Sequence, residues 1–383
     1  MQEERKMPGK YQICTNCVMD TSDPQITFDE QGQCDFCSNY YHTILPSWHA
    51  DERGWMELEA LALKMKKDGK GKQYDCIIGM SGGVDSSYLT YIVKIKMDLR
   101  PLLVTVDTGW NLDVANENVD RMVKALGLDL ETITIDYEEI NALQLAFLKA
   151  AVPYQDLPQD CGLFAALYNY ANEKGIKYIL TGGNYSTECV KPPLEWTYIN
   201  DVTMLKDIFR RFGNGKFEKY PLCGMFKKRV WYRYGKGIQV LWPLNYVKYD
   251  KAEATKILEA KVGWKSYDKK HFENRFTRFY EGYWLPRKFG YDKRRCYDSS
   301  MILTGQMTRE EALRDLEQQP YDEQTAMEDK KYICERLGIT EEQMDEFFAL
   351  PNKTYRDYKN SLWIINMAVR LAMLLGVEKR NFR

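Results

Sequence analysis

Four short apolar runs alternate with helical patterns in the first half of the chain. The apolar runs, each bounded by glycine or polar residues, lie at residues 76–80, 102–106, 132–135 and 178–181. Helical spacing of apolar positions recurs at residues 52–68, 86–96, 114–126, 138–150 and 163–173. Buried strands alternating with helices of this length predict a doubly wound α/β fold, a parallel sheet with helices on both faces. Ligands of such sheets bind at the carboxyl ends of the strands.

The pattern changes beyond about residue 200. Aromatic and basic residues become frequent over 206–236, and about the last hundred residues have helical patterns. Thr308-Arg-Glu-Glu311 predicts a helix start, because a Thr at the N-cap and a Glu three residues later satisfy each other's backbone N–H groups. We therefore expect three parts: an N-terminal segment at 1–50, an α/β domain at 51–200 and a mainly helical region at 201–383.

Residues 362–375 form the most apolar stretch of the chain and end at Gly376. The stretch contains Asn366 and Arg370 and is shorter than the roughly 20 residues that cross a bilayer. We expect a buried C-terminal helix, with a docking helix for a partner or a membrane surface as the alternative. Because the first residues are polar, we also expect no secretory signal and no membrane span, and a cytoplasmic protein.

Composition narrows the function classes. The 383 residues carry 54 Lys and Arg against 55 Asp and Glu, a net charge of -1. That balance argues against a general nucleic-acid-binding protein, which needs a cationic excess. Only three histidines are present, His42, His49 and His271, so a mechanism that needs several imidazoles is disfavoured.

Four of the ten cysteines form two CxxC pairs, Cys14 with Cys17 and Cys34 with Cys37. Each pair can direct two thiolates at one point, and two pairs complete a tetrahedral site. We predict a structural Zn²⁺ ion that holds together a segment too short for its own core, with an iron–sulfur cluster as the alternative. The other six cysteines have no partner at metal-binding spacing, and we expect them to behave as small apolar residues.

The strongest chemical signal is Ser81-Gly82-Gly83-Val84-Asp85-Ser86-Ser87, which lies between an expected strand and an expected helix. The glycines allow a tight turn that exposes backbone N–H groups, the serines add hydroxyl donors, and the helix N-terminus favours an anion. The loop lacks the Gly-Lys-Ser/Thr ending of a Walker A motif. It predicts a phosphate-binding loop.

This motif resembles that of the PP-loop ATP pyrophosphatases, which bind the pyrophosphate of ATP there and adenylate a substrate oxygen. Two further elements are similar to the superfamily's motifs. Asp107 ends the second expected strand, where the superfamily binds adenine and ribose, and Thr181-Gly182-Gly183-Asn184, with Glu188 after it, is similar to a TGxN element. The common relatives have a histidine where Gly183 stands, so the role of that histidine does not carry over.

The rest of the chain resembles the N-acetyl sugar amidotransferases of bacterial O-antigen and flagellin-sugar biosynthesis. The resemblance runs from about Cys14 to Tyr358 and rests on the cysteine pairs and on motifs around residues 270–279, 285–295 and 299–312. It implies a reaction in which ATP adenylates the acetamido oxygen of a nucleotide-linked N-acetyl sugar. Ammonia then displaces AMP to give an acetamidino sugar.

We expect the ATP site at Ser81, Gly82, Gly83, Asp85, Ser86, Ser87, Asp107, Gly182 and Asn184. Asp85 is the expected holder of a Mg²⁺ ion that bridges the phosphates. We infer catalytic roles for Asp85, Lys270, His271 and Glu273, although His271 can equally be a structural histidine. The diphosphate of the sugar nucleotide needs cations, and the candidates are Arg275, Arg278, Lys288, Lys293, Arg294 and Arg295, unless they form a solvated basic face.

The chain shows no glutaminase of its own. Position 2 is Gln2, which excludes an N-terminal cysteine nucleophile there, and three histidines leave little for a catalytic triad. The family implies separate partners that resemble the glutaminase and cyclase subunits of imidazole-glycerol-phosphate synthase. Two other hypotheses stay open: a PP-loop tRNA-modifying enzyme of the thiolase or lysidine-synthetase type, with 206–236 as its RNA surface, and a non-catalytic ATP-binding zinc-ribbon scaffold.

Overall fold

The computed structural model describes residues 11–267 and 273–374. Its central sheet has the strand order β3-β2-β1-β4-β5, and every neighbouring pair is parallel. The strands are β1 Cys76–Gly79, β2 Pro101–Asp107, β3 Asp129–Thr134, β4 Tyr178–Leu180 and β5 Gln239–Leu241. The chain first adds strands on one side of β1 and then on the other, which confirms the doubly wound α/β fold. The switch point lies between β1 and β4, where such folds bind ligands.

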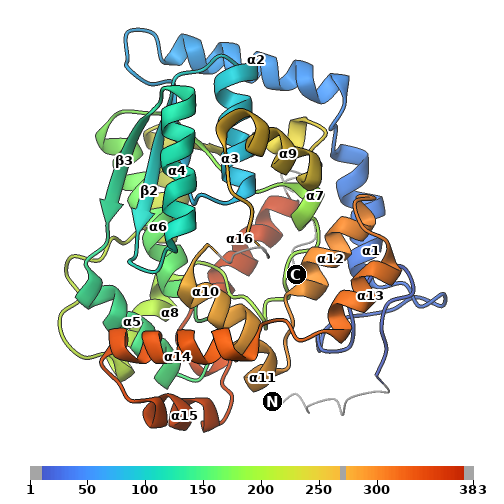
Figure 1. Cartoon of the computed structure of the whole chain (residues 1–383), viewed down its shortest axis with the longest axis vertical. Coiled ribbons are helices and arrows are strands. Elements are labelled where there is room, and N and C mark those ends of the chain that lie inside the picture. Colours follow the sequence, from blue (N-terminus) through green and yellow to red (C-terminus); the bar gives the residue numbers. More distant parts are fainter. Residues whose placement is uncertain (1–10, 268–272, 375–383) are drawn as a thin grey trace.

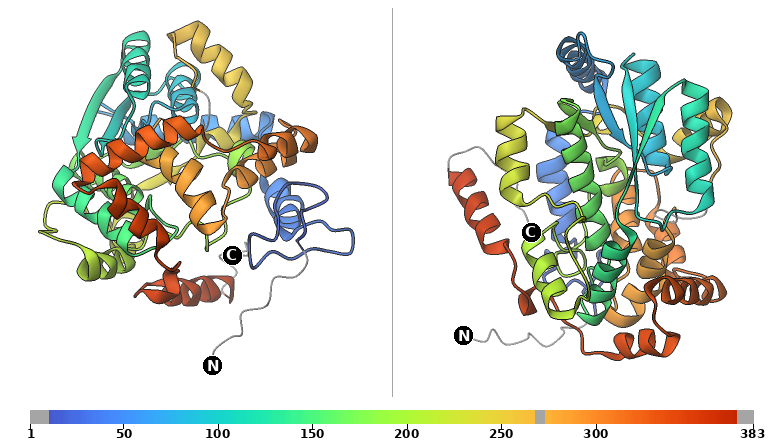
Figure 2. Two further views of the ribbon diagram at one scale, coloured as in Figure 1. Left: turned by 60° about the horizontal axis from the view of Figure 1, so that its bottom comes forward. Right: turned by 90° about the vertical axis from the view of Figure 1, so that its left-hand side faces the viewer.

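Alternate residues of each strand pack into two separate cores, because successive side chains point to opposite faces. Cys76 and Ile78 of β1 pack against α2 (Glu52–Asp68), α3 (Val84–Tyr91), α4 (Asp113–Leu126) and α9 (Lys251–Val262). Ile77 of the same strand faces α5 (Tyr137–Lys149), α6 (Leu157–Glu173) and α8 (Val202–Phe212). The right view of Figure 2 shows helices on both sides of the sheet.

The α/β unit extends beyond the boundary expected at residue 200. β5 pairs with β4 through Tyr178 and Gln239, and α9 covers the face formed by α2, α3 and α4. The sequence pattern missed β5 because a strand of three residues is too short to show a period. The sheet therefore draws its last strand from the region that the sequence assigned to the helical part.

The remaining helices gather at the carboxyl ends of the strands, at the opposite end of the molecule from α2 (Figure 1). Their bounds are α10 Arg275–Phe279, α11 Leu285–Phe289, α12 Arg294–Leu303, α13 Arg309–Glu317, α14 Glu323–Leu337 and α15 Glu341–Ala349. The capping box predicted at Thr308 is present at the start of α13. A π-helix, η6 (Tyr280–Trp284), joins α10 to α11 without a break. This helical layer forms the wall that faces the switch point.

The C-terminal helix α16 (Leu362–Leu374) differs from the expectation of a buried helix. Trp363 is 63% exposed and Leu374 is 84% exposed, whereas Leu362, at the start of the helix, packs against the core next to α8. An apolar pattern cannot distinguish a helix that packs in the core from one that presents an apolar face outward. Within residues 11–267 and 273–374, no helix has the length and apolar character needed to cross a bilayer.

Candidate functional site

The loop between β1 and α3 is held by its own serines. The Ser86 hydroxyl donates to the Gly83 carbonyl at 3.2 Å and lies 3.2 Å from the Ser81 hydroxyl, which accepts from the Gly83 N–H. Gly82 has φ +81°, and a Cβ there would lie 2.3 Å from the Ala115 carbonyl oxygen of α4. A side chain at position 82 is thus excluded by both conformation and space.

The loop after β4 packs directly against the start of α3. A Cβ on Gly182 would lie 2.9 Å from the Ser86 backbone nitrogen, so only glycine permits this approach. The Asn184 side chain accepts from the Thr187 N–H and donates to the Gly182 carbonyl, which starts the short helix α7 (Tyr185–Glu188). The two glycine loops therefore meet at the switch point, at the N-terminus of α3, where an anion is favoured.

Residues just before and just after α9 pack against the same loop from the other side. The Trp264 indole donates to the Gly82 carbonyl at 3.0 Å, and the Tyr249 hydroxyl donates to Asp85. The Tyr267 hydroxyl lies 3.3 Å from a Glu273 carboxylate oxygen and would lie 3.0 Å from a Cβ on Gly83. Burial and the neighbouring carboxylates raise the pKa of both tyrosines above the usual value, so both stay protonated donors. These residues therefore contact the loop at Gly82, Gly83 and Asp85 and hold it in its observed conformation.

A cavity of about 630 Å³ opens from the loop toward the helical layer. Its volume falls in the range of ordinary small-molecule sites. One end is lined by the loop and by Gly182, and the other end by α6, η6 and α12. Among the lining residues that carry charge are Asp85, Asp156, Asp160, Glu188, Lys251, Glu273, Glu281 and Lys293.

Asp156, just before α6, is an acid whose pKa is strongly raised. Burial raises the pKa of its carboxyl to about 8. Its Oδ1 accepts from the Thr277 hydroxyl at 3.0 Å and from the Gln159 amide at 3.1 Å. The side-chain amide of Gln159 is held in this orientation, because its Oε1 accepts hydrogen bonds from the Thr108 hydroxyl and the Asn274 amide. Among the residues described, Oδ2 of Asp156 has no hydrogen-bond partner, so the network leaves that oxygen available to the cavity.

Lys293 lies deeper in the same end of the cavity and is 7% exposed. Burial alone would lower the pKa of its ammonium group, but the Glu281 carboxylate 2.7 Å away outweighs this and holds the pKa well above the usual value. The ammonium also lies 5.2 Å from the Tyr280 ring centroid. The wall of the cavity therefore contains a buried ammonium group that stays protonated and is paired with Glu281.

The structure brings together many of the residues predicted from the sequence. Those that line the cavity are Ser81, Gly83, Asp85, Ser86, Gly182, Glu273 and Lys293. Gly82, Ser87 and Asn184 belong to the two glycine loops and to the start of α3 but do not line the cavity. Asp107 accepts hydrogen bonds from the Gly109 N–H and the Tyr137 hydroxyl at the end of β2 and does not line the cavity. Lys270 and His271 lie outside the described residues.

The other predicted phosphate-binding cations contact protein groups outside the cavity, whereas Lys293 lines the cavity, although it too is ion-paired, with Glu281. Arg275 and Arg278 both pair with Asp329 of α14. Lys288 donates to the carbonyls of Phe348 and Leu350 at the end of α15. These three side chains tie the C-terminal helices together.

Arg294 and Arg295 also make structural contacts. Arg294 pairs with Asp292 and Asp315. Arg295 pairs with Asp20 and donates to the Val18 carbonyl, so it ties the N-terminal segment to α12. The basic block thus builds the helical layer, which the sequence alone could not show because most of its acidic partners are distant in sequence.

The four N-terminal cysteines form one buried cluster whose sulfur atoms all lie within 4.8 Å of one another. Backbone N–H groups point at the sulfurs, including Cys34 N–H to Cys14 Sγ at 3.2 Å, and the Asn16 amide donates to Cys37 Sγ. Such donors stabilise thiolates that hold a metal ion. Four converging thiols with no other ligand fit a closed structural Zn²⁺ site.

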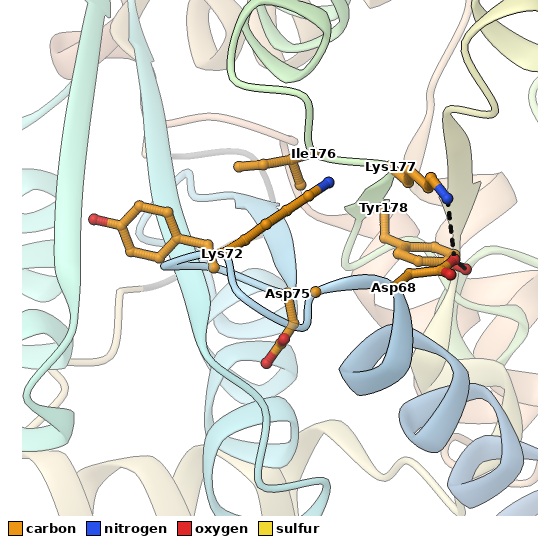
Figure 3. A pocket seen from close by; sticks show the side chains of 8 residues that line it. Asp68, Lys72, Asp75, Ile176, Lys177 and Tyr178 are labelled. Carbon is orange, nitrogen blue, oxygen red and sulfur yellow. Dashed lines mark hydrogen bonds and ion pairs between the residues drawn. The ribbon is translucent and has the colours of Figure 1, made fainter.

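A second recess, at the amino ends of β1 and β4, carries no site. Figure 3 shows Lys177 paired with Asp68 across it, at 3.6 Å. The Tyr178 hydroxyl donates to the same carboxylate, and Asp75 pairs with Arg100. The recess lacks room for a water molecule. The carboxyl ends of the strands remain the functional edge.

Sequence reasoning missed Asp156, Gln159 and Asp160 because the helix was expected to begin at residue 163, whereas α6 begins at Leu157. Pro158 in the first turn was an available signal, since proline is favoured at helix starts. Tyr249, Trp264 and Glu281 carry no comparable signal. They reach the loop or the cavity only through the packing of α9 and η6.

Part of the chain matches a known family model. Residues 273–371 match the family model described as "LPS biosynthesis protein WbpG-like, C-terminal domain". An uncharacterised protein of Methanocaldococcus jannaschii is 31% identical over 129 residues, 33% of this chain and 43% of that protein. A tRNA-specific 2-thiouridylase of Clostridium tetani is 30% identical over 119 residues, 28% of this chain and 33% of the enzyme. The chain spans less than half the length of these relatives.

Solved structures give only a weak likeness. The NH3-dependent NAD synthetase of Campylobacter jejuni is 19% identical, with a TM-score of 0.27 and coverage of 34% of this chain and 58% of that one. The NMN synthetase of Francisella tularensis is 15% identical, with a TM-score of 0.28 and coverage of 78% and 97%. At such low sequence identity and TM-score, these structures say nothing about the activity of this chain. The segment that matches the WbpG-like C-terminal domain therefore follows a parallel α/β sheet whose first strand leads into the glycine loop.

Proposed function

We propose that the protein is an ATP-dependent amidotransferase that converts the acetamido group of a nucleotide-linked N-acetyl sugar into an acetamidino group, for surface-polysaccharide or flagellin-sugar biosynthesis. The observation that carries the proposal is one cavity of about 630 Å³ that joins the glycine loop to a wall built partly by the WbpG-like segment. A cavity shared in this way lets ATP and a second substrate meet.

The chemistry needs ATP because an amide oxygen is a poor leaving group. The amide oxygen attacks the α-phosphorus of ATP, and pyrophosphate departs toward Gly83 and the N-terminus of α3, whose donors stabilise its charge. Ammonia then forms a bond to the imidoyl carbon, and AMP leaves with the electron pair of the carbon–oxygen bond. A bound Mg²⁺ ion would supply further neutralisation of the phosphates, and Asp85 is the residue placed to hold it.

Asp156 is our candidate for the proton acceptor of the second half-reaction. The nitrogen loses protons as the amidine forms, and the ionised fraction of the Asp156 carboxyl, which grows as the pH approaches about 8, can accept one of them. Gln159 and Thr277 hold Oδ1, which leaves Oδ2 for the incoming nitrogen. Lys293, held by Glu281, is placed to contact an anionic group of the substrate.

The ammonia would come from separate glutaminase and cyclase-like partners. Outside the zinc cluster, the described cysteines are buried or half-buried, and burial raises the pKa of Cys161 and Cys189 above the usual value. A glutaminase needs a reactive thiolate. These cysteines are unsuited to that task, so we propose that the chain uses ammonia supplied from outside.

The test is a pyrophosphate-release assay with ATP, ammonium and a panel of UDP-, GDP- and CMP-linked N-acetyl sugars. We expect release with at least one sugar and a product about one mass unit lighter, because NH replaces O. Asp85→Asn should abolish release, whereas Asp345→Asn, on exposed α15, should leave it unchanged. Release from no acetamido sugar would rule out the proposal.

A tRNA-modifying enzyme is the second candidate, favoured by the 2-thiouridylase among the relatives. That function requires a tRNA-binding surface, and binding should then fall steeply with salt. Adding unmodified tRNA to the same assay separates the two. Pyrophosphate release that depends on tRNA and not on sugar would favour this candidate.

A further inference from the structure

Two exposed segments combine apolar side chains with cations in a way that the cavity does not explain. The first is the π-helix η4 (Lys227–Gly235) with the residue before it, Phe226. The second is α16. We define them together as the apolar–basic face. In the right view of Figure 2, both segments stand on the same outer side of the molecule.

In η4, one side chain is an anchor and most of the others point outward. Tyr232 is 2% exposed and stacks on Tyr168 of α6 at a centroid distance of 5.7 Å. Phe226 is 75% exposed, Tyr234 is 77% exposed, and Trp231 is half-exposed. Lys227 and Lys228 also contact α6, through Asn169 and the Phe164 ring, while the aromatic rings stay outward. Large exposed aromatic rings are costly in water, so they indicate a surface that becomes covered.

The charge around η4 has one sign. From Lys219 to Tyr249 the chain contains seven Lys and Arg residues and no Asp or Glu. Arg229 and Arg233 are exposed, and no ion pair with either occurs within residues 11–267 and 273–374. A surface that is cationic without internal neutralisation is complementary to an anionic partner.

The outer face of α16 continues the apolar character. Trp363, Met367, Leu371 and Leu374 recur at helical spacing and are all exposed. Leu362, Ile365 and Val369 lie on the opposite, partly buried side. The only charged residue of the helix is Arg370, also exposed. An amphipathic helix with an outward apolar stripe and a cation beside it has the character of helices that lie in a bilayer interface.

We propose that the apolar–basic face docks the protein onto an anionic phospholipid membrane surface. Trp and Tyr rings with adjacent Lys and Arg suit the headgroup region, where rings insert and cations meet phosphate. A protein partner fits less well, because lysine is depleted in protein interfaces while η4 exposes both Lys227 and Lys236. This proposal is independent of the proposed reaction, since neither segment lines the cavity.

The experiment is co-sedimentation of the purified full chain with vesicles of phosphatidylcholine alone and of phosphatidylcholine with phosphatidylglycerol. We expect binding to the anionic vesicles that weakens as salt is raised, because screening reduces the attraction. Arg229→Gln with Arg233→Gln should weaken that binding about tenfold or more. Trp231→Ser with Trp363→Ser should weaken binding at both low and high salt.

The control variant is Met56→Ser with Leu63→Ser, which removes two equally exposed apolar side chains from α2. It should bind anionic vesicles like the wild type, and all variants should keep the wild-type unfolding temperature because the altered residues are exposed. Equal loss in the control variant would overturn the proposal. So would the absence of binding to anionic vesicles, including the case in which sedimentation velocity shows that the same face joins two copies of the chain.

Discussion

At the scale of single residues, the cavity depends on acids whose charge is controlled by burial. Asp156 is the clearest case, because its carboxyl has a pKa of about 8 and is oriented by Gln159 and Thr277. Folding favours the protonated form of this group, while the unfolded chain ionises near the ordinary value for aspartate. The stability of the protein is therefore linked to pH through this one site.

The sign of that linkage gives a prediction for Asp156→Asn. Between about pH 4 and pH 8 the native state holds a proton that the unfolded chain has lost, so the wild type loses stability as pH rises. The asparagine variant lacks this cost. Relative to the wild type, it should gain stability between pH 5 and pH 9 by about 4 kcal/mol, measured by urea unfolding. A difference that does not change with pH would contradict the assignment.

A second prediction concerns Trp264, which acts on the phosphate loop through one hydrogen bond to the Gly82 carbonyl. Trp264→Phe keeps the buried ring and removes the donor. ATP affinity, measured by calorimetry, should fall about fivefold, because a lost hydrogen bond costs about 1 kcal/mol. Trp363→Phe, on the exposed face of α16, is the control and should bind ATP normally. Unchanged affinity in Trp264→Phe would show that the loop needs no such support.

At the scale of elements, the N-terminal segment is attached to the C-terminal helices rather than to the sheet. Arg309 of α13 donates to the carbonyls of Cys14 and Cys17, and the Ser299 hydroxyl of α12 accepts from the Val18 N–H. Each of these hydrogen bonds goes to a backbone group that is correctly placed only when the cysteine turns are formed. The cluster therefore stabilises α12 and α13 along with its own turns.

Removing one thiol should show this dependence. Cys17→Ser should reduce the zinc content from about one ion per chain to near zero and cost at least about 2 kcal/mol of unfolding free energy. Cys223→Ser, outside the cluster, should retain the metal and most of the stability. Elemental analysis and thermal unfolding make the measurement. Iron in place of zinc, with visible absorbance, would instead identify an iron–sulfur cluster.

The elements also show what the sequence could predict. Strands β1, β2 and β4, the glycine loop and the cysteine pairs follow from local patterns, and the structure has them within a few residues of the expected positions. The strand β5, the early start of α6 and the outward face of α16 were missed. Each depends on what the element packs against, which no local pattern records.

At the scale of the whole molecule, the cavity is assembled from segments that are distant in sequence. Gly83, Asp156, Glu273 and Lys293 line one space, yet more than two hundred residues separate the first from the last. The local sequence identified the loop and placed the basic block near the site. It could not show that Arg278 and Arg294 pair with Asp329 and Asp315, because ion pairing between distant segments is decided by tertiary packing.

The proposed external ammonia supply gives a further prediction. The purified chain should accept ammonium at alkaline pH and should give no turnover with glutamine alone, measured as glutamate release. Adding a glutaminase partner should restore turnover with glutamine. Hydrolysis of glutamine by the chain alone would contradict the proposed division of labour.

The central claim is that the acetamido oxygen is adenylated. It is tested most directly with a nucleotide-linked N-acetyl sugar that carries ¹⁸O in the acetamido carbonyl, incubated with ATP and ammonium. Because that oxygen bonds to the α-phosphorus and leaves with AMP, the account predicts that AMP gains the ¹⁸O label as the acetamidino sugar forms. Unlabelled AMP, with its oxygen taken from water, would contradict it.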